Sequence, residues 1–320
     1  MSNSANINSS ISQMIQKLGL DNSKELSDDI DNFDVHVFKA FDFIPDLVLT
    51  IRSYTIKKTF KHLFGNVQTL ENSIFFSFHN FFKDDLIKKA FTRINEELPH
   101  VKIIPMNSSQ EQTFYEYTHM KHVGILVSAD YLKEFLVDDA EKFKDLLACQ
   151  DSFIMEEFMS DDVVRTINEI VNSENNVSLP QFYFKLKALE LLYFLFKRLN
   201  KREKTAFQRL TQLEISNLYK VRDRLIAQLD VAPSLSELKS IACMNEIKLR
   251  KSFIQIFGMG MYDYFQHIRI KEAARLIREE KLSVSEAGYH LGFTNLSHFS
   301  RVFEACIGMK PKKWSVKATI

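Results

Sequence analysis

The last hundred residues contain a repeat with a spacing of about fifty, and this repeat limits the fold of that region more than any other feature. The segment Ser234-Leu-Ser-Glu-Leu matches Ser283-Val-Ser-Glu-Ala at an offset of 49. After one inserted residue, the offset becomes 50 and pairs Leu249, Phe253, Gly258-Met259 and Tyr264 with Phe299, Phe303, Gly308-Met309 and Trp314. An ordered set of matches at one period predicts two copies of a single supersecondary unit.

Each copy predicts a helix, a tight turn and a second helix. In the first copy, about residues 234–257, a serine at 234 or 236 caps a helix over 237–242, and a second helix covers 246–257. In the second copy, about 283–306, a serine at 283 or 285 caps 286–291. Gly292 permits the turn there, and Asn295 caps 296–306. Two short helices joined by a turn of this length have the geometry of helix-turn-helix DNA readers.

The second helix of each copy carries side chains that can bond to base edges or phosphates. They are Lys248, Arg250 and Lys251 in the first copy, and Asn295, Ser297, His298 and Arg301 in the second. An ordinary solvated helix face is the alternative explanation, but two such helices in tandem favour DNA binding.

The segment between the copies predicts one helix over about 262–280, with Phe265, Ile268, Ala273 and Leu276 near helical spacing. At 1.5 Å per residue this helix is roughly 27 Å long. Successive major grooves on one face of DNA lie ~34 Å apart. A rigid connector of that order can hold two recognition helices in adjacent grooves.

The front two hundred residues change from a strand pattern to a helix pattern near Ser128. Candidate strands cover 35–41, 47–55, 74–79, 101–104, 112–117 and 123–127, whereas 81–98 fits either a hairpin or a helix. Short strands at this spacing indicate a sandwich or a barrel. Candidate helices follow over 129–135, 143–147, 161–172 and 181–199.

The helix over 181–199 has apolar residues on more than one face. One set has coiled-coil spacing, and its members are Phe182, Leu186, Leu189, Tyr193 and Phe196. Either the whole helix packs within its own domain, or this set forms a homodimer contact. Both alternatives are equally compatible with the pattern.

No catalytic constellation appears in the front domain. His119 and His122 are three residues apart, but no nearby carboxylate pattern supports a metal site. The aromatic run Phe75, Phe76, Phe78, Phe81 and Phe82 predicts core packing, with the wall of an apolar ligand pocket as the alternative. The three cysteines form no cluster with metal-site spacing.

The net charge of +1 conceals an asymmetry between the two parts. From Thr211 onward there are 17 Lys and Arg against 11 Asp and Glu, whereas the preceding residues hold 25 against 30. A basic tail behind an acidic front domain is typical of a nucleic-acid reader fused to another module. The N-terminus lacks a basic, apolar signal segment, and no apolar run approaches the ~20 residues that span a bilayer.

Residues 215–318 resemble the AraC/XylS family of bacterial regulators. The second copy carries the family signature as Val284-Ser-Glu-Ala-Gly-Tyr-His-Leu-Gly-Phe-Thr-Asn-Leu-Ser-His-Phe-Ser-Arg-Val-Phe, followed by Gly308 and Pro311. The connecting segment carries Tyr264-Phe265, Arg269-Ile270, Ala273 and Leu276-Ile277. The resemblance implies a front domain that senses a small molecule or dimerises, often a cupin-like β-barrel followed by helices.

Carried over by position, the resemblance implies base reading by Ile247, Arg250 and Lys251 in one copy, and by Leu296, Ser297 and Arg301 in the other. The apolar side chains of Ile247 and Leu296 cannot form hydrogen bonds with a base edge, although they could contact a thymine methyl group. Gly288, where the family has another small helix residue, is expected to weaken its helix by ~1 kcal/mol.

We therefore expect an α+β chain. It has a disordered lead-in over 1–30, an effector-binding or dimerisation domain over 31–200 with a cupin-like barrel, and a linker over 201–212. An all-α DNA-binding domain covers 213–320, with two helix-turn-helix units joined by a linker helix. The expected function is sequence-specific transcription regulation, as a cytoplasmic activator without enzymatic activity or a cofactor.

The expected partners are double-stranded promoter DNA, RNA polymerase, a small-molecule effector and a second copy of the chain, with no membrane. Two alternatives stay open. One is a cupin-like, metal-dependent β-barrel enzyme fused to the DNA-binding tail. The other is a front domain that binds no small molecule and only dimerises or binds a protein.

Overall fold

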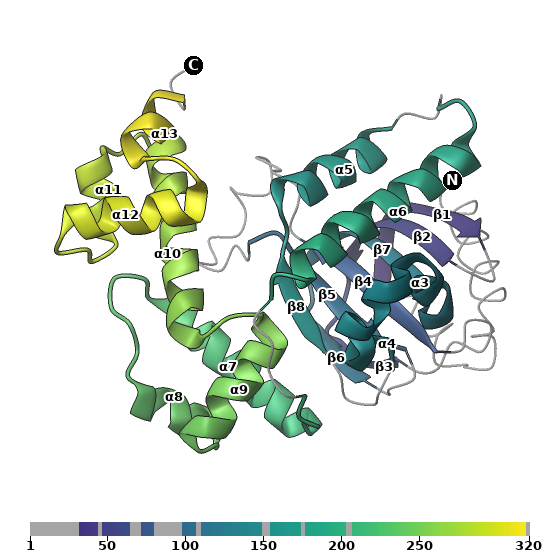
Figure 1. Ribbon diagram of the computed structural model, residues 1–320, viewed down its shortest axis with the longest axis horizontal. Coiled ribbons are helices and arrows are strands. Elements are labelled where there is room, and N and C mark those ends of the chain that lie inside the picture. The colour runs from purple at the N-terminus through teal and green to yellow at the C-terminus, as the bar shows by residue number, and fades with distance from the viewer. Residues whose placement is uncertain are drawn as a thin grey trace. The chain divides into compact units, whose positions relative to one another are not determined.

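The computed structural model describes residues 32–43, 47–64, 72–79, 98–106, 110–148, 154–173, 177–202 and 207–317. These residues form two compact units, of which the first ends at Arg202 (Figure 1). The predicted lead-in over 1–30 and nearly all of the segment 81–98 lie outside the described residues. No helix in the described ranges is long and apolar enough to cross a bilayer.

The first unit contains two sheets followed by helices. Its strands are β1 (Phe33–Phe43), β2 (Leu47–Ile56), β3 (Phe60–Phe64), β4 (Ser73–His79), β5 (His100–Pro105), β6 (Gln110–Phe114), β7 (His119–Ser128) and β8 (Met155–Phe158). Its helices are α3 (Ala129–Leu136), the 3₁₀ segment η1 (Val137–Phe143), α4 (Lys144–Leu147), α5 (Asp161–Asn172) and α6 (Pro180–Leu199). The change from strands to helices near Ser128 is thus present, with β8 as an exception.

Six of the strands form one antiparallel sheet in the order β1-β2-β7-β4-β5-β8, and β3 pairs with β6 in a second sheet. In the described residues β1 and β8 remain the edges of the larger sheet, which is therefore not closed. The unit is a mixed α/β structure with an open sheet, and the cupin-like barrel is not confirmed.

The helices pack on one face of the six-stranded sheet. On that face, the Phe76 ring lies 6.1 Å from the ring of Phe196 on α6, and the Phe41 ring stacks on Phe184 at 3.6 Å. Phe76 and Phe78 are completely buried. Because strand side chains alternate between faces, Phe75 points to the opposite face. The sheet therefore divides the aromatic run, whose members Phe81 and Phe82 lie outside the described residues.

Strand β8 was not predicted, and the reason lies in its partners. Its sequence Met-Glu-Glu-Phe contains two glutamates, which strands ordinarily disfavour. In the fold, Glu156 lies 3.7 Å from the Lys102 ammonium group, and Glu157 accepts a 2.9 Å hydrogen bond from Arg198 Nε. Long-range ion pairing thus compensates two acidic residues that are 6% and 5% exposed.

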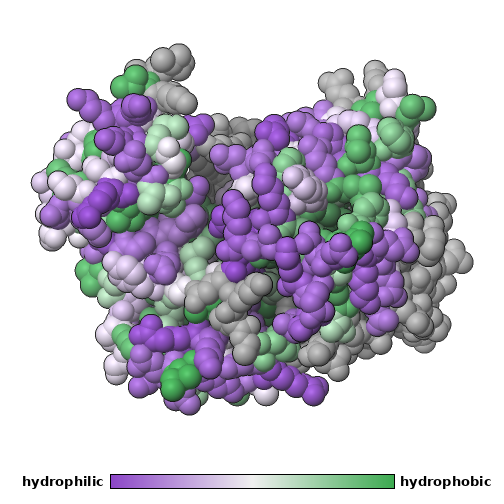
Figure 2. All heavy atoms as spheres, viewed as in Figure 1, coloured by the Kyte–Doolittle hydropathy of each residue, from purple (hydrophilic) through white to green (hydrophobic). Residues whose placement is uncertain are grey.

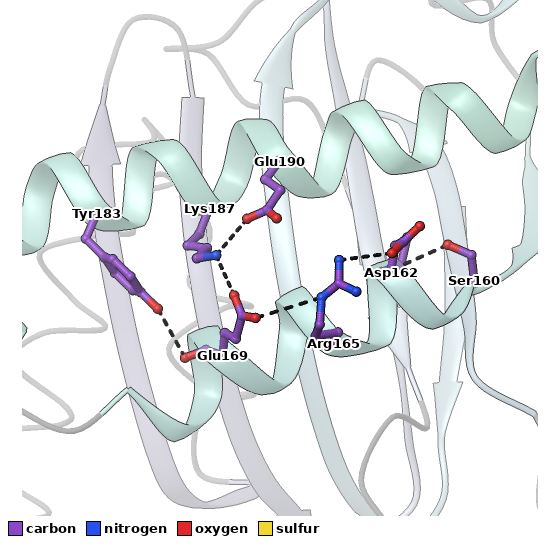
Figure 3. A network of polar contacts seen from close by, with 8 residues as sticks. Ser160, Asp162, Arg165, Glu169, Tyr183, Lys187 and Glu190 are labelled. Carbon is purple, nitrogen blue, oxygen red and sulfur yellow. Dashed lines mark hydrogen bonds and ion pairs between the residues drawn. The ribbon is translucent and has the colours of Figure 1, made fainter.

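A polar network fastens α5 to α6 (Figure 3). Lys187 on α6 donates to Glu169 on α5 and to Glu190 on its own helix, the latter at 2.7 Å. Tyr183 donates its hydroxyl to the Glu169 carbonyl at 3.5 Å, and Arg165 pairs with Asp162 at 2.9 Å. The face of α6 toward α5 is therefore occupied by contacts within the unit.

The second unit consists of helices. They are α7 (Gln212–Ala227), α8 (Leu235–Ala242), α9 (Glu246–Phe257), α10 (Met261–Arg278), α11 (Val284–His290), α12 (Leu296–Ile307) and α13 (Pro311–Lys317). Helix α10 packs against α7 and α9 on one side of the repeat and against α11, α12 and α13 on the other. Two helical bundles therefore share one long helix, as Figure 1 shows.

Candidate nucleic-acid interface

Helices α8 and α9 form the first helix-turn-helix unit. Ser234 caps α8 by accepting from the Glu237 backbone N–H, and Asn245 caps α9 by accepting from the Lys248 N–H. Cys243 ends α8 with a φ of 54°, a left-handed conformation that reverses the chain. The turn is set by these local bonds, so the orientation of α9 follows from the sequence around it.

Helices α11 and α12 form the second unit with equivalent bonds. Ser283 and Glu286 make a reciprocal capping box, and these hydrogen bonds lower the pKa of the Glu286 carboxyl group. Asn295 caps α12 by accepting from the N–H groups of Ser297 and His298. Gly292 supplies the left-handed turn residue, with a φ of 72°.

The repeat places equivalent aromatic residues in equivalent cores. Phe253 meets the Tyr264 ring edge-to-face at 5.6 Å in the first unit, and Phe303 meets Trp314 at 6.5 Å in the second. Phe253 and Phe303 are both completely buried. These buried rings fix which sides of α9 and α12 face the core, and therefore which sides face outward.

The outward side of α9 carries most of the residues predicted for DNA contact. Ile247 is 69% exposed, and Arg250 and Lys251 are exposed beside it. Arg250 pairs with Glu246 one turn earlier at 2.8 Å, whereas half-buried Lys248 pairs with Glu214 on α7. Lys248 would therefore have to exchange a carboxylate for a phosphate in order to contact DNA.

The outward side of α12 is formed by Asn295, Ser297 and Arg301, which are all exposed. His298 is half-buried, and its ring lies 6.1 Å from that of Phe293. Ser297 and Arg301 lie fifty residues after Ile247 and Lys251, so the two helices present equivalent positions. No described contact assigns any of these side chains to a base, and their role stays a prediction.

Inside the second unit, Leu296 occupies space that the absence of a side chain at Gly288 leaves open. Leu296 is partly buried and packs against the core that contains Phe299 and Phe303. A Cβ atom at Gly288 would lie 2.9 Å from Leu296 Cδ2 and 3.4 Å from the Phe299 ring. The glycine that the sequence marks as a weak helix position thus leaves space for two side chains of α12.

Arg269 on α10 joins the connecting helix to the second turn, a role that the sequence did not indicate. Its Nε donates a 2.6 Å hydrogen bond to the Leu291 carbonyl, and its guanidinium lies 3.9 Å from the Phe293 ring centroid. Burial lowers its pKa, whereas nearby Tyr262 and Asp230 act in the opposite direction. The spacing of residues along the helix cannot reveal such a bond, because its acceptor is a backbone carbonyl 22 residues away.

The loop before the first unit touches the turn of the second. A Cβ atom placed on Gly292 would lie only 2.1 Å from the Asp230 carbonyl oxygen. Leu229, one residue earlier, packs against the core of the second unit. The loop between α7 and α8 is therefore in direct contact with the turn of the second unit, in addition to the contacts made by the shared helix α10.

The predicted dimer residues on α6 divide into two sets. Phe182, Leu186 and Tyr193 are 70%, 52% and 61% exposed, and Leu189 is partly exposed. Phe196, by contrast, is 7% exposed and packs against Phe76 and Phe143 within its own unit. We correct the prediction for Phe196 accordingly, because the spacing in sequence could not show which face the sheet covers.

The two histidines considered as metal ligands point to opposite faces of β7. His119 bonds to the Thr55 hydroxyl at 3.1 Å, whereas His122 lies on the other face with its ring 5.5 Å from Tyr54. A separation of three residues on a strand enforces this divergence. Within the described ranges, no three His, Cys, Asp or Glu side chains are placed to hold a metal ion.

Two short helix pairs with capped, outward-facing second helices, joined by one helix, define a double helix-turn-helix domain. Residues 238–316 match the family model described as a helix-turn-helix domain. In this domain the chain is similar to transcriptional regulators of the AraC family.

Characterised relatives match a minor part of the chain. The regulatory protein PchR of Pseudomonas aeruginosa is 36% identical over 76 residues, which are 24% of this chain and 26% of PchR. The transcriptional activator RhaR of Escherichia coli K12 is 32% identical over 97 residues, or 30% of this chain and 34% of RhaR. The matching segment thus spans about a quarter to a third of these relatives.

Solved structures give more distant likenesses. A probable AraC family regulator from Rhodopseudomonas palustris is 21% identical, covers 32% of this chain and 97% of its own, and has a TM-score of 0.30. ToxT from Vibrio cholerae O395 is 13% identical, covers 90% of this chain and 99% of its own, and has a TM-score of 0.31. Both scores are too low to carry an argument about the first unit.

Proposed function

We propose that this protein is a sequence-specific DNA-binding transcription regulator that inserts α9 and α12 into successive major grooves of promoter DNA. The observation that carries this proposal is the equivalence of the two units around α10. Both present a capped helix with exposed polar or basic side chains at matching positions. A domain of this kind spans two grooves without a second copy of the chain.

The contacts fall into two groups. Lys251 and Arg301 occupy matching positions and can reach guanine edges, while Ser297 can bond to any base pair. Arg250, Asn295 and His298 lie beside them and suit phosphates or neighbouring bases. Ile247 and Leu296 offer apolar contact to thymine methyl groups, and Lys248 offers a phosphate contact once it leaves Glu214.

The first test is selection of binding sites from random double-stranded DNA by the purified protein. We expect an enriched sequence with two half-sites about one helical turn apart. Selection of a single short half-site, or of no sequence, would contradict insertion of both helices.

We predict that Arg301→Ala relaxes base preference at one position of the selected site. The lost bidentate bond to a guanine should cost ~1–3 kcal/mol at that position and little elsewhere. Lys312→Ala is the matched control, because it removes one exposed positive charge from α13 without touching α12. Competition binding with single-base variants measures both; equal weakening on all sequences would make Arg301 a phosphate contact.

The proposal extends to the first unit and to the cell. We propose that the first unit senses a small molecule and forms a homodimer through the exposed residues of α6. The regulator acts in the cytoplasm as an activator that contacts RNA polymerase. The order of strands and then helices supports a sensory unit of the kind found in this family, and the apolar exposure on α6 supports the dimer. Expression measured at a promoter that carries the selected site, with and without the protein, tests the direction of regulation.

A further inference from the structure

A row of basic side chains crosses the sheet on the face opposite to the helices. Arg52 on β2 pairs in register with His122 on β7, His122 with His79 on β4, and His79 with His100 on β5. Residues at paired positions lie on the same face of a sheet. The His79 ring lies 5.5 Å from that of His122 and 5.4 Å from that of His100. We call these four residues the basic row.

Two members of the basic row have buried polar atoms without partners among the described residues. His122 is 6% exposed, and neither of its ring nitrogens has a hydrogen-bond partner there. The Arg52 Nε atom is likewise inaccessible and unpaired. Buried polar groups are nearly always satisfied in proteins, so each of these atoms calls for an acceptor or donor from elsewhere.

The charge in this region is also unbalanced. Burial and the neighbouring positive groups, including Arg52, lower the pKa of His79 and of His122 well below the usual value. Among the described residues of the larger sheet, the acidic ones on this face are Glu156, which pairs with Lys102, and Asp42, which lies opposite Val48 at the far end of β2. Arg52 is partly buried with an inaccessible Nε atom, and it has no counter-ion among the described residues, which is costly; an anion placed beside it would lower that cost.

The Arg52 side chain is held in place by its packing. Its guanidinium carbon lies 5.4 Å from the Phe75 ring centroid. Gly124 on β7 provides the space, because a Cβ atom there would lie 2.8 Å from the Phe75 ring and 3.0 Å from an Arg52 Nη atom. A guanidinium fixed on an aromatic ring loses little freedom when it binds a carboxylate.

Apolar side chains border the basic row on both sides along the strands. Val48 and Leu126 are buried on one side, and the partly buried residues Phe38, Phe75 and Met106 pack against them. On the other side Tyr54 and Ile56 are buried, and the partly buried residues Phe33, Phe60 and Met120 pack against them. The same face thus combines a fixed cation with flanking apolar surface, the composition expected of a small-molecule site.

We infer that this face binds a small-molecule carboxylate with an apolar body, whose carboxylate group is held by Arg52 and His122. The inference rests on the sensory role in the proposed function and gives that role a ligand class. Arg52 supplies a forked pair of donors, His122 supplies a ring N–H, and the flanking residues cover the apolar body.

The test uses the full chain and two probes that differ only in charge, 4-phenylbutyrate and 4-phenylbutan-1-ol. Thermal unfolding is followed while each probe is titrated to millimolar concentration. We expect the carboxylate to raise the unfolding temperature in a saturable way and the alcohol to have little effect. An equal response to both probes, or no response to either, would overturn the inference.

Single substitutions test whether Arg52 and His122 form the binding site. Arg52→Met should weaken binding of 4-phenylbutyrate by about tenfold or more, and His122→Leu should also weaken it. Lys39→Met is the matched control: it removes an exposed positive charge from β1 on the other face and should leave binding unchanged. Arg52→Met should also unfold at the same or a higher temperature than the parent without probe, because an unpaired buried charge is removed.

One outcome would show that the basic row has an internal structural role instead of a ligand. If Arg52→Met were strongly destabilised without probe and the parent did not respond to 4-phenylbutyrate, Arg52 would have an internal acidic partner, and the inference would be wrong. DNA binding is measured on the same preparations. A parent protein that binds the selected DNA but does not bind 4-phenylbutyrate would overturn this inference alone and leave the proposed function standing.

Discussion

Gly292 and Gly308 both follow a helix with a positive φ, of 72° and 82°, but their surroundings differ. Nothing lies within 4 Å of a Cβ atom placed on Gly308, whereas one on Gly292 would meet the Asp230 carbonyl at 2.1 Å. The two positions therefore separate the cost of backbone conformation from the cost of crowding. Gly292 is also the point at which the loop between α7 and α8 touches the second unit.

We predict that Gly292→Ala destabilises the second unit more than Gly308→Ala does. The Gly308 substitution should cost about 1–2 kcal/mol, the strain of a left-handed conformation. The Gly292 substitution adds the displacement of a backbone carbonyl, for a total of roughly 2–5 kcal/mol. Urea denaturation of both variants measures the difference; equal losses would show that the contact with Asp230 is not maintained in solution.

The histidines of the basic row predict how stability depends on pH. The folded-state pKa values of His79 and His122 lie well below the unfolded value near 6.5. Below pH 6.5 the unfolded chain therefore takes up protons that the folded chain does not. Stability should fall as the pH decreases through this range, by up to about 1.4 kcal/mol per pH unit for each histidine, and stay level above it.

The measurement compares urea midpoints between pH 7.5 and 5 for the parent and for His122→Gln. The variant should show a shallower loss of stability on acidification, because one titrating group has been removed. The positive groups Arg52, Lys102 and His100 remain in both proteins, so they do not explain a difference. The same pH slope in both proteins would mean that His122 is not buried as described.

At the scale of elements, helix α6 packs within its own unit on one side and is exposed to solvent on another. Lys187 and Tyr183 fasten it to α5, and buried residues such as Leu195 and Phe196 fasten it to its own unit. Phe182, Leu186 and Tyr193 remain exposed, and Figure 2 shows apolar atoms (green) gathered over the region of α5 and α6. An exposed row of large apolar side chains is typical of an interaction surface.

We predict that Leu186→Glu shifts the protein from dimer to monomer without unfolding it. Leu186 is 52% exposed, so a charge there costs little in the monomer but would have to be buried in a dimer. Sedimentation velocity measures the change, and Lys201→Glu, at an exposed residue just after the end of α6, controls for the added negative charge. A parent protein that is already monomeric at micromolar concentration would refute the dimer.

At the scale of the whole molecule, the second unit has a core and an N-terminal attachment of its own. Gln255 Nε2 donates to the Gln208 carbonyl at 2.9 Å, and Leu210 is 1% exposed. Thr211 and Glu214 then form a capping box that starts α7. Gln208, Leu210 and Thr211 are thus bound into the second unit before its first helix begins.

We predict that a fragment of residues 203–320 folds cooperatively and binds the selected DNA site. Its affinity should fall with salt concentration along the same logarithmic slope as for the full chain, because all phosphate contacts come from this unit. Thermal unfolding and DNA titrations at several salt concentrations provide the measurements. A fragment without a cooperative transition, or with a clearly smaller salt slope, would place part of the core or of the DNA contact in the first unit.

The sequence by itself determined the helical repeat, because every signal for it is local. Caps such as Ser283 and Asn295, the turn at Gly292 and the spacing of Phe253 and Phe303 act within a few residues of the chain. Helix α9 begins and ends at the predicted residues, Glu246 and Phe257, for this reason. The change from strands to helices near Ser128 follows in the same way from the periodicity of neighbouring side chains.

Only the tertiary structure decided the features that depend on distant pairs. Strand β8 exists because Lys102 and Arg198 compensate its glutamates, and the sheet remains open because of strand order, which no local pattern encodes. The basic row forms because register brings Arg52 beside His122, seventy residues away. Phe196 and Leu186 both belong to the set with coiled-coil spacing on α6. Only packing against Phe76 places Phe196 in the core, whereas Leu186 stays on the surface.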